Sequence, residues 1–459
     1  MLRVQSLAYA RDQQSIFSGL TFNVDPGTIL HIKGANGAGK SSLLRILAGL
    51  CSASSGSLHC AVSRLYIGHQ MGLHPALSPV QNLLWLMKLR GLASSSMIAA
   101  IHHALRALGL EGEAHTSCKA LSKGQYQRVG LARLMLDPAK LWILDEPCTG
   151  LDAGGIHFLE ACYERQLQRG GAIIIASHQD CFGDALQAQV ITLVPHQTSF
   201  SEWHSGTYIP VFDDLPSLES TPLMLTRKNF LNRPLVSIFG AFWGLLRRDC
   251  MIYSQHPADP LAALGFFSLI SSLFLILFGF LPSLLVQIGP ALIWMAVLLA
   301  LLMSIESILR SDYQAGALDH LILSKHPLAV LCFSKMLAHM LVVGLPLLLV
   351  APVVALLFHF NPAAVVALAL SLLLGIPSIT LIASVGAALT LGLERGAWLV
   401  MLLILPLLLP LILLGVHAVI CAAQGLAWQA DILLLSAVFI FSVVAAPLLM
   451  AFTLRVSLE

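Results

Sequence analysis

The sequence predicts two parts of different fold class: an α/β domain over residues 1–195 and an all-α domain of six transmembrane helices over residues 238–459. Most charges fall before about residue 250, and long apolar runs dominate after it, in a chain that is 57% hydrophobic and 11% charged. In the first part, short apolar runs typical of buried strands alternate with helical patterns. Residues 196–237 contain several prolines among polar residues and no convincing period, which indicates a linker.

A glycine-rich loop at residues 34–42 matches G-x-x-x-x-G-K-[ST], the pattern of a phosphate-binding loop. An apolar strand at 29–32 precedes it and a helix at 43–48 follows, as the motif requires. The glycines let backbone N–H groups converge on phosphates, Lys40 adds a full positive charge, and the Ser41 hydroxyl can bind Mg²⁺. The predicted nucleotide contacts are Gly34, Ala35, Asn36, Gly37, Ala38, Gly39, Lys40, Ser41 and Ser42. A glycine-rich turn that matches by chance is the alternative.

Two half-buried strands are expected before this loop, at 2–9 and 20–24, because apolar and polar residues alternate there. Tyr9 lies in the first strand and is a candidate for stacking on the nucleotide base. A strand tyrosine is also typical of a hydrophobic core, which is the alternative. The net charge of only +2 gives no indication of a nucleic-acid partner.

Between the loop and residue 136, the apolar spacing predicts helices at 80–90, 97–108 and 126–136. The last of these follows the sequence Leu-Ser-Lys-Gly-Gln. A hydroxyl and a glycine at a helix N-terminus offer a second anion site, and a plain helix cap is the alternative. The candidate nucleotide contacts in this segment are Ser122, Gly124 and Gln125.

Two further buried strands, at 141–144 and 172–176, end in polar residues. The first ends in Asp145, which can hold Mg²⁺ directly or through water. Glu146 is adjacent and is placed to polarise a water molecule for attack on the γ-phosphate. The second strand ends near His178, and in an open parallel sheet the carboxyl ends of the strands gather the functional groups.

One more motif, Thr-Gly-Leu-Asp at 149–152, lies between the acidic strand end and Ser-His at 177–178. In this order, the motifs resemble those of an ABC-type ATPase domain over residues 1–195. The resemblance implies ATP hydrolysis with Mg²⁺, with Glu146 as the catalytic base and His178 as the γ-phosphate switch. It also implies a second ATPase copy, because the segment around Ser122 closes over ATP held by another copy. The Mg²⁺-binding glutamine of the family falls by spacing on His69 or on its neighbour Gln70; Gln70 is the candidate metal ligand.

Beyond residue 260, six apolar segments are long enough to span a membrane, which takes about 20 residues each. They lie approximately at 261–281, 287–308, 328–358, 363–391, 397–422 and 432–454. The third and fourth are overlong, so tilt or a break is expected, with Pro346, Pro352 and Pro377 as candidate kinks. An amphipathic surface helix is expected at 239–250, with Arg247 and Arg248 at its polar end.

Basic residues predict the orientation of these segments. If the segments alternate, one side carries Arg247, Arg248, Arg310, Lys325, Arg395 and Arg455, whereas the opposite loops carry no Lys or Arg. The ATPase domain and both termini are therefore expected in the cytoplasm. The polar segment 306–326 is expected to lie on the ATPase surface and transmit its motion, and an ordinary solvated loop is the alternative.

Isolated polar residues in the apolar segments are interpreted as structural. Lys335 is expected to extend to the cytoplasmic interface, although its depth also fits a functional site. The histidines at 339, 359 and 417 are expected to be hydrogen-bonded structural residues rather than haem ligands, because the chain has no C-x-x-C-H motif.

The membrane part resembles the CcmB membrane subunit of cytochrome c maturation systems across nearly all of residues 240–459. The resemblance rests on segments that include Leu309–Leu318, Leu374–Pro377, Gly386–Leu393 and Leu454–Glu459. The first part is similar to the partner ATPase, CcmA, through Gly-His-Gln at 68–70 and its short length. The chain thus resembles a CcmA–CcmB fusion, although the two are commonly separate proteins in that family.

This resemblance implies an ABC-type translocase of the bacterial inner membrane that uses ATP to deliver haem toward a periplasmic haem chaperone for c-type cytochrome assembly. Whether haem itself crosses, or ATP instead releases the loaded chaperone, stays open. The implied partners are a second ATPase copy, other cytochrome c maturation membrane proteins, the chaperone and membrane lipid. The alternatives are an exporter of another small or lipophilic substrate and a membrane-anchored, ATP-dependent regulator or phosphate-transferring enzyme.

Overall fold

The computed structural model describes residues 1–11, 14–92, 96–178, 186, 188–193, 238–255, 257–391 and 396–458, with the side chains of 396–403 excluded. The chain divides into two compact units. The first contains Met1–Ser237 together with Gln314–Lys325, and the second contains Ile238–Tyr313 and His326–Leu458. The expected linker lies outside the described residues apart from its flanks, so the domain boundaries stay predictions.

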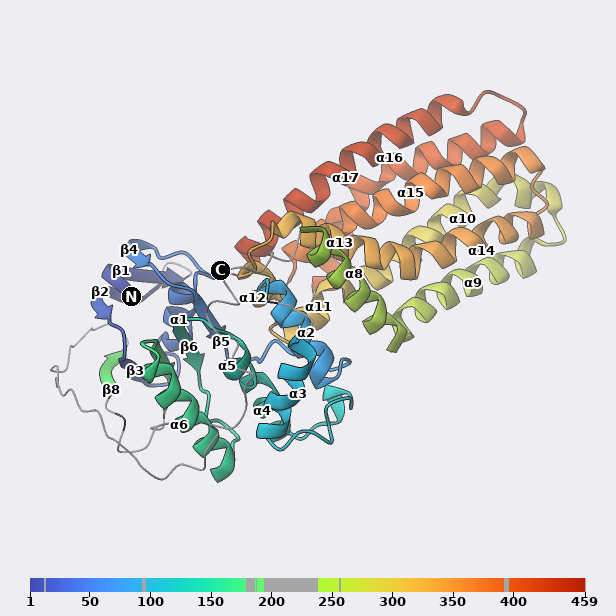
Figure 1. The fold of residues 1–459 in the computed structure, drawn as a ribbon. Coiled ribbons are helices and arrows are strands. Elements are labelled where there is room, and N and C mark those ends of the chain that lie inside the picture. The colour runs from blue at the N-terminus through green and yellow to red at the C-terminus, as the bar shows by residue number, and fades with distance from the viewer. Residues whose placement is uncertain are drawn as a thin grey trace. The chain divides into compact units, whose positions relative to one another are not determined.

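A parallel five-stranded sheet forms the centre of the first unit, in the order β5-β6-β7-β3-β8 (Figure 1). Its strands are β3 (Ile29–Gly34), β5 (Arg64–Ile67), β6 (Leu141–Asp145), β7 (Ala172–Ala176) and β8 (Ala188–Leu193). Strands β6 and β7 are buried along their whole length, as continuous apolar runs predict for a parallel sheet. Helices α1 (Lys40–Ala48) and α6 (Ala153–Gln168) pack against these strands. The α/β class of the first part is confirmed.

A second, antiparallel sheet has the order β2-β1-β4 and consists of β1 (Leu2–Arg11), β2 (Gln14–Val24) and β4 (Ser55–Cys60). The predicted alternation is present, because Leu2, Val4 and Leu7 of β1 are fully buried between exposed neighbours. These side chains join α1 and the parallel sheet in one hydrophobic core.

The other helices in the described part of the first unit are α2 (Pro79–Leu89), α3 (Met97–Ala107), α4 (Lys123–Leu131), α5 (Arg133–Leu136), the 3₁₀ turn η1 (Cys118–Ala120) and α12 (Ala317–Ile322). Helix α2 begins at Pro79, a residue that is common in the first turn of a helix. Ser78 and Gln81 fix this start, because each side chain accepts a hydrogen bond from the other residue's backbone N–H group. The helix predicted at 126–136 is divided into α4 and α5 at Ala132.

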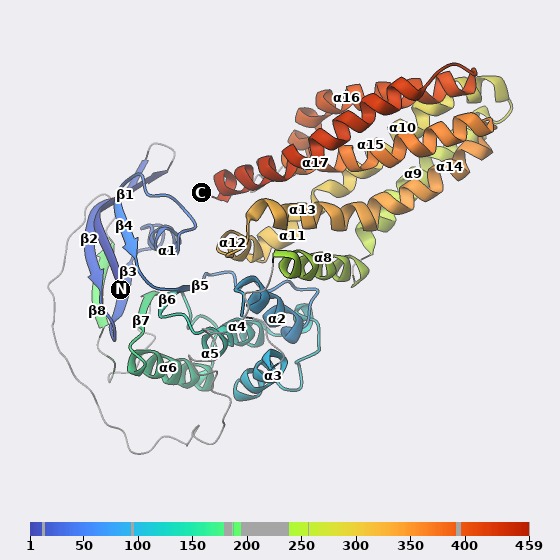
Figure 2. The same cartoon turned by 45° about the horizontal axis from the view of Figure 1, so that its top comes forward.

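The second unit is helical. It consists of α8 (Ile238–Gln255), α9 (Ala258–Phe278), α10 (Pro282–Ile305), α11 (Ser307–Gln314), α13 (Leu328–His339), η3 (Met340–Gly344), α14 (Leu345–Leu357), α15 (Pro362–Leu389), α16 (Gly396–Ala423) and α17 (Gln429–Leu458). The long helices lie side by side in a bundle (Figure 2).

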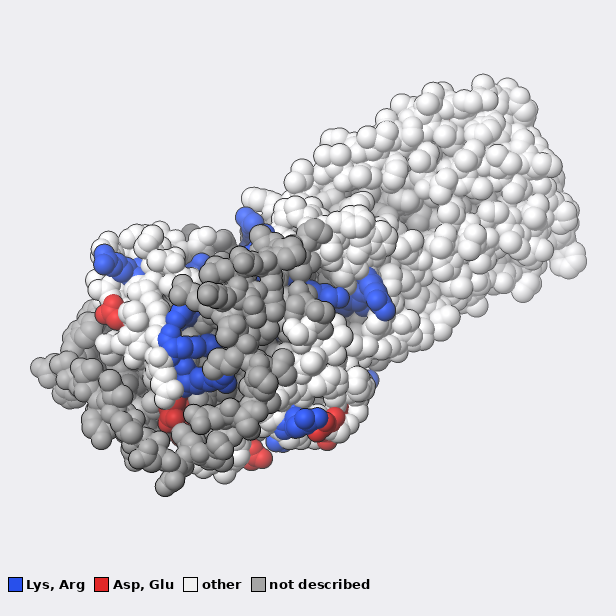
Figure 3. Space-filling model, viewed as in Figure 1, with Lys and Arg blue, Asp and Glu red and all other residues white. Residues whose placement is uncertain are grey.

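Among the described residues, six helical segments are long and apolar enough to cross a membrane, which confirms the predicted number. Their outer faces are apolar, with Ile276, Phe441 and Phe452 each about two-thirds exposed or more. The face of the bundle visible in Figure 3 accordingly shows almost no charged side chain. Exposed apolar surface of this extent is typical of contact with lipid.

The overlong third and fourth segments behave differently. The third contains the π-helical turn Met340–Gly344 directly before Pro346, and such a turn accommodates a proline ring within a helix. The fourth, α15, is one continuous helix through Pro377, so it has no break there, and the tilt and the kink at Pro377 stay predictions. Packing of α15 against α10, α16 and α17 supports the continuous helix.

Four charged side chains form a buried cluster in the second unit. Arg248 of α8 lies 2.5 Å and 3.0 Å from the two carboxylate oxygens of Asp312 in α11. Lys335 of α13 lies 2.6 Å from Asp312 and 3.0 Å from Asp249, and Asp249 also binds Arg248 at 2.8 Å. No side chain of the four is more than 6% exposed. Arg248, predicted at the polar end of a surface helix, is thus buried, and the prediction that Lys335 extends to the interface is wrong, because buried carboxylates neutralise each cation.

Candidate nucleotide site

A cavity of about 590 Å³ lies near the carboxyl ends of β3, β6 and β7. Parallel strands bring their following residues to one edge of the sheet, so motifs far apart in sequence meet there. The lining residues are Arg11, Ile16, Asn36, Gly37, Gly39, Lys40, Ser41, Ser42, His69, Asp145, Glu146, Thr149 and His178. The structure thus places the phosphate loop, the acidic strand end and the Ser-His histidine around one space.

The loop presents a helix N-terminus to this cavity. Helix α1 begins at Lys40, and Gly39 before it has φ of 90°, in the left-handed region that favours glycine. A Cβ atom at Gly39 would also clash with the side chain of Ile16. Within the described residues no side chain caps the first turn of α1, which leaves its N–H groups suited to an anion. Ala38 is buried in the core rather than lining the cavity.

The Lys40 ammonium is held at the loop. It donates to the carbonyl oxygens of Gly34 at 2.7 Å and Ala35 at 3.0 Å. It also lies 3.1 Å from Nε2 of His178, which faces it as an acceptor because an ammonium can only donate. Nε2 of His178 is 3.7 Å from the Glu146 carboxylate. Lys40, His178 and Glu146 therefore form one polar chain across the cavity.

The two carboxylates at the end of β6 have different environments. Asp145 is only 3% exposed, and burial raises its pKa even though the Ser41 hydroxyl donates a hydrogen bond to it. Glu146 has φ of +49°, a strained conformation for a residue with a side chain, and its N–H donates to Ala176 of β7. Asp145 and Ser41 together offer oxygen ligands, which a hard cation such as Mg²⁺ prefers.

Ser122 and Gln125 form a capping box at the start of α4, in which each side chain accepts from the other residue's backbone N–H. Gly124 lies close to Gly150, so that a Cβ atom there would be 3.0 Å from the Gly150 carbonyl oxygen. These three residues are not among those that line the cavity. The geometry confirms the helix cap, and their nucleotide contact stays a prediction.

Two predicted contacts differ from the structure. The ring of Tyr9 is 9% exposed and packs 6.0 Å from the ring of Phe17 within the core, so the prediction that it stacks on a base is wrong. The structure places Arg11 and Ile16 at the cavity instead, two residues that the sequence pattern did not indicate because the antiparallel pairing of β1 with β2 positions them. His69 lines the cavity and Gln70 does not.

The segment Gln314–Lys325 belongs to the first unit and carries several polar contacts to it. Asp319 of α12 binds Arg45 of α1 at 3.1 Å. His320 accepts from Arg133 of α5 at 2.9 Å, and the carbonyl oxygen of Ala315 accepts from the N–H of Gly72 at 2.9 Å. The contact predicted for residues 306–326 is therefore present at Gln314–Lys325, and the transmission of motion stays a prediction.

Gln70 and Gly316 meet at the same contact. Gly316 has φ of 72°, and a Cβ atom there would lie 2.7 Å from the Cβ of Gln70. Only glycine fits this position, and the backbone turn it allows starts α12. His69 and Gln70 thus lie at two different places: the first at the cavity and the second beside α12.

His320 is neutral in this contact. Burial lowers its pKa well below its ordinary value, and the positive charges of Arg133 and Arg90 lower it further. The hydrogen bond from the guanidinium of Arg133 needs an unprotonated Nε2, which agrees with that direction.

The two parts of the chain match two families. The ABC transporter family matches residues 17–149, and the CcmB protein family matches residues 240–457. Heme exporter protein B of Pseudomonas aeruginosa is 40% identical over 213 residues, which are 46% of this chain and 96% of that protein.

The first part has relatives of its own. Cytochrome c biogenesis ATP-binding export protein CcmA of Yersinia pseudotuberculosis is 41% identical over 192 residues, 39% of this chain and 87% of that protein. The protein of the same name from Methylococcus capsulatus is 41% identical over 197 residues, 40% of this chain and 94% of its own length. The chain therefore belongs to the CcmA family of ABC ATPases in its first part and to the CcmB family in its membrane part, with the two joined in one polypeptide.

Proposed function

We propose that this protein hydrolyses ATP to drive haem export for c-type cytochrome biogenesis, as a multi-pass protein of the bacterial inner membrane. The observation that supports this most strongly is the presence of both families in one chain, each covering most of a relative named for cytochrome c biogenesis or heme export. Six membrane-spanning helices and an ATPase cavity are the two parts that such an activity needs.

ATP binding would use the groups around the cavity. The N-terminus of α1 and the loop N–H groups bind the β- and γ-phosphates, and the Lys40 ammonium turns from the carbonyls of Gly34 and Ala35 to these phosphates. Ser41 and Asp145 would hold Mg²⁺, which neutralises charge on the phosphates when it is bound.

Hydrolysis would use Glu146 as the general base. Its carboxylate removes a proton from the attacking water molecule, and His178, which lies between Glu146 and Lys40, contacts the γ-phosphate. Loss of the γ-phosphate then changes the contacts of Lys40 and His178, so the site distinguishes ATP from ADP.

A second copy of the chain completes the site in this proposal. Ser122, Gly124 and Gln125 lie outside the cavity of their own chain, and in a dimer they would close over the nucleotide of the partner. The start of α4 is suited to such a contact, because the capping box uses the N–H groups of Ser122 and Gln125, and the N–H groups of Lys123 and Gly124 and the proton of the Ser122 hydroxyl would be available to an anion.

The segment Gln314–Lys325 would transmit closure of the ATPase domains to the membrane helices. It is held to the first unit through Asp319 and His320, and it continues directly into α11 on one side and α13 on the other. This arrangement, with the basic residues beside it, favours a cytoplasmic ATPase domain. Cytochrome c maturation membrane proteins and a periplasmic haem chaperone are the partners this function needs.

Covalent haem on c-type cytochromes tests the proposal. In a strain that lacks the chromosomal gene, we expect these cytochromes to lose covalent haem and a plasmid copy of the gene to restore it. Normal maturation in the deletion strain would contradict haem export and leave the ATPase assignment standing. Stimulation of ATP turnover by a lipid or drug in the purified protein would instead support an exporter of that substrate.

A further inference from the structure

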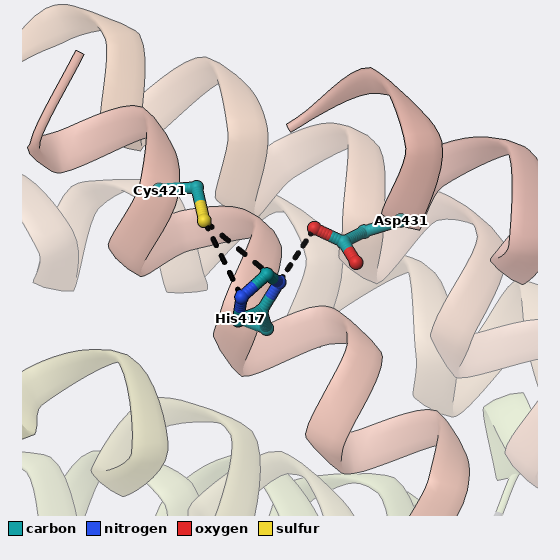
Figure 4. A group of neighbouring side chains, drawn as sticks. All are labelled: His417, Cys421 and Asp431. Atoms are coloured by element: carbon teal, nitrogen blue, oxygen red, sulfur yellow. Dashed lines mark hydrogen bonds and ion pairs between the residues drawn. The ribbon is translucent and has the colours of Figure 1, made fainter. Parts of the chain in front are cut away.

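Three metal-binding side chains meet where α16 passes into α17 (Figure 4). His417 and Cys421 are one turn apart near the end of α16, and Asp431 lies in the first turn of α17. Their ligand atoms all lie within 4.8 Å of one another. None of the three takes part in the nucleotide site or in the contact of α12.

The carboxylate fixes the orientation of the imidazole. Oδ2 of Asp431 lies 2.8 Å from Nδ1 of His417, so Nδ1 carries the proton and donates it. Sγ of Cys421 lies 3.5 Å from Nε2 and 3.8 Å from Nδ1, beside the ring rather than along the lone pair of Nε2. A carboxylate that holds the other ring nitrogen is the usual support of a histidine that binds a metal ion.

The distance between these two atoms suits one shared ion. A nitrogen at 2.0–2.1 Å and a sulfur at 2.3 Å from a tetrahedral zinc ion are about 3.5 Å apart. The same two atoms are 3.5 Å apart here, and a rotation of the largely exposed His417 side chain would turn the Nε2 lone pair toward an ion that replaces the thiol proton of Cys421. No movement of the helix backbone is required, because both ligands belong to α16.

Burial and charge also suit a cation. Cys421 is 7% and Asp431 9% exposed, whereas the His417 side chain is 64% exposed. A bound cation would compensate the buried carboxylate and a deprotonated thiol, and its outer coordination positions would face the exposed side for water or another ligand. The turn itself is held in place, since Asn361 donates to the carbonyl oxygen of Ala423 at 3.0 Å.

We propose that His417 and Cys421 bind a small divalent transition-metal ion of the zinc class, with Asp431 positioning the imidazole. His417 and Cys421 together do not suit the iron of haem, because a porphyrin leaves only the two positions on opposite faces of its plane. Two donors 3.5 Å apart cannot occupy both. This site does not depend on the proposed haem export.

Cobalt spectroscopy on the full-length protein tests this site. The protein is purified in detergent, stripped of metal and titrated with Co²⁺, followed by Zn²⁺ as competitor. We expect a thiolate-to-cobalt charge-transfer absorption at one ion per chain, which Zn²⁺ removes. Cys421→Ser should abolish the absorption, and His417→Ala and Asp431→Asn should each weaken Co²⁺ binding by about 10–100-fold.

Two matched variants serve as controls. Cys250→Ser replaces a cysteine of α8 and His359→Ala replaces a histidine of the turn between α14 and α15, and both should retain the wild-type titration. ATPase activity of every variant reports correct folding. No absorption in the wild type, or an absorption that survives Cys421→Ser, would overturn the proposal. A haemin spectrum that requires His417, without any cobalt absorption, would likewise overturn it in favour of haem binding.

Discussion

At the scale of single residues, the ends of β6 and β7 place Glu146 and His178, and the loop after β3 brings Lys40 beside them. The positive φ of Glu146 is a local strain that the hydrogen bond from its N–H to Ala176 helps to hold. It separates the environment of Glu146 from that of its buried neighbour Asp145. The two adjacent carboxylates can therefore have different roles, in which Asp145 binds a metal ion and Glu146 accepts a proton.

Replacement of Glu146 by glutamine tests its role as the proton acceptor. We expect Glu146→Gln to lower the rate constant of ATP hydrolysis by about 10²–10⁴-fold, because an amide cannot accept the proton of water. ATP binding, measured with a fluorescent ATP analogue, should change little because the phosphate loop is intact. Glu164→Gln in α6 is the matched control and should hydrolyse ATP at the wild-type rate. Unchanged turnover in Glu146→Gln would exclude this residue as the base.

At the scale of elements, α12 is held to the rest of the first unit by a hydrogen bond that depends on the protonation state of His320. His320 accepts a hydrogen bond from Arg133 only when it is neutral, and its pKa lies well below its ordinary value. An exposed histidine takes up a proton below a pH of about 6.5. The detached segment thus binds more protons in acid than the docked one, so acid weakens docking and higher pH restores it.

The pH dependence of docking follows from the lowered pKa of His320. We expect docking to be complete above about pH 7.5 and to weaken by about tenfold for each pH unit below 6.5. Hydrogen exchange of the amides in Gln314–Lys325, corrected for the intrinsic pH dependence, measures it. His320→Gln keeps an acceptor but does not titrate, and its docking should be independent of pH over this range. An equal loss of docking below pH 6.5 in His320→Gln would contradict the role of His320.

The buried charge cluster joins three elements of the second unit: α8, α11 and α13. Two cations and two carboxylates balance there, and the removal of one cation leaves an uncompensated buried charge. We expect Lys335→Met to destabilise the protein by about 3–5 kcal/mol, measured as unfolding in detergent. The double variant Lys335→Met/Asp249→Asn restores the charge balance and should regain part of this loss.

Arg247→Met is the control for this cluster, because Arg247 is adjacent in α8 but exposed. It should change the free energy of unfolding by less than about 0.5 kcal/mol. A loss in Arg247→Met as large as in Lys335→Met would contradict a specific role for the buried cluster.

The sequence predicted the elements whose signals are local. The strand, loop and helix around Lys40 and the cap formed by Ser122 and Gln125 are encoded within a few residues, and the structure has them as expected. The six spans are also local signals of length and composition.

Features that depend on distant partners were not predictable in this way. Lys335 pairs with Asp249, 86 residues earlier, and Arg248 pairs with Asp312, 64 residues later. Neither cation has its partner carboxylate within its own stretch of sequence, so local patterns could not indicate that both are buried. The burial of Tyr9 depends on Phe17 of the neighbouring strand. Neither pattern nor spacing indicated that His417, Cys421 and Asp431 would converge.

At the scale of the whole molecule, one polypeptide combines an ATPase of the CcmA family with a membrane domain of the CcmB family. In a homodimer, two ATPase domains and two sets of membrane helices would therefore assemble together without a separate ATPase subunit. Among the described residues, the chain returns to the ATPase unit at Gln314–Lys325. The central claim is that ATP hydrolysis does work on the membrane helices through this segment.

The most direct test is covalent haem on c-type cytochromes in a strain that carries only a variant of this gene. Asp319→Arg places two like charges at the contact of α12 with Arg45, and the double variant Arg45→Asp/Asp319→Arg restores an ion pair with its charges exchanged. We predict that Asp319→Arg loses covalent haem while the purified variant still hydrolyses ATP, and that the double variant regains it. Normal haem attachment in Asp319→Arg, or in the hydrolysis-deficient Glu146→Gln, would contradict the claim.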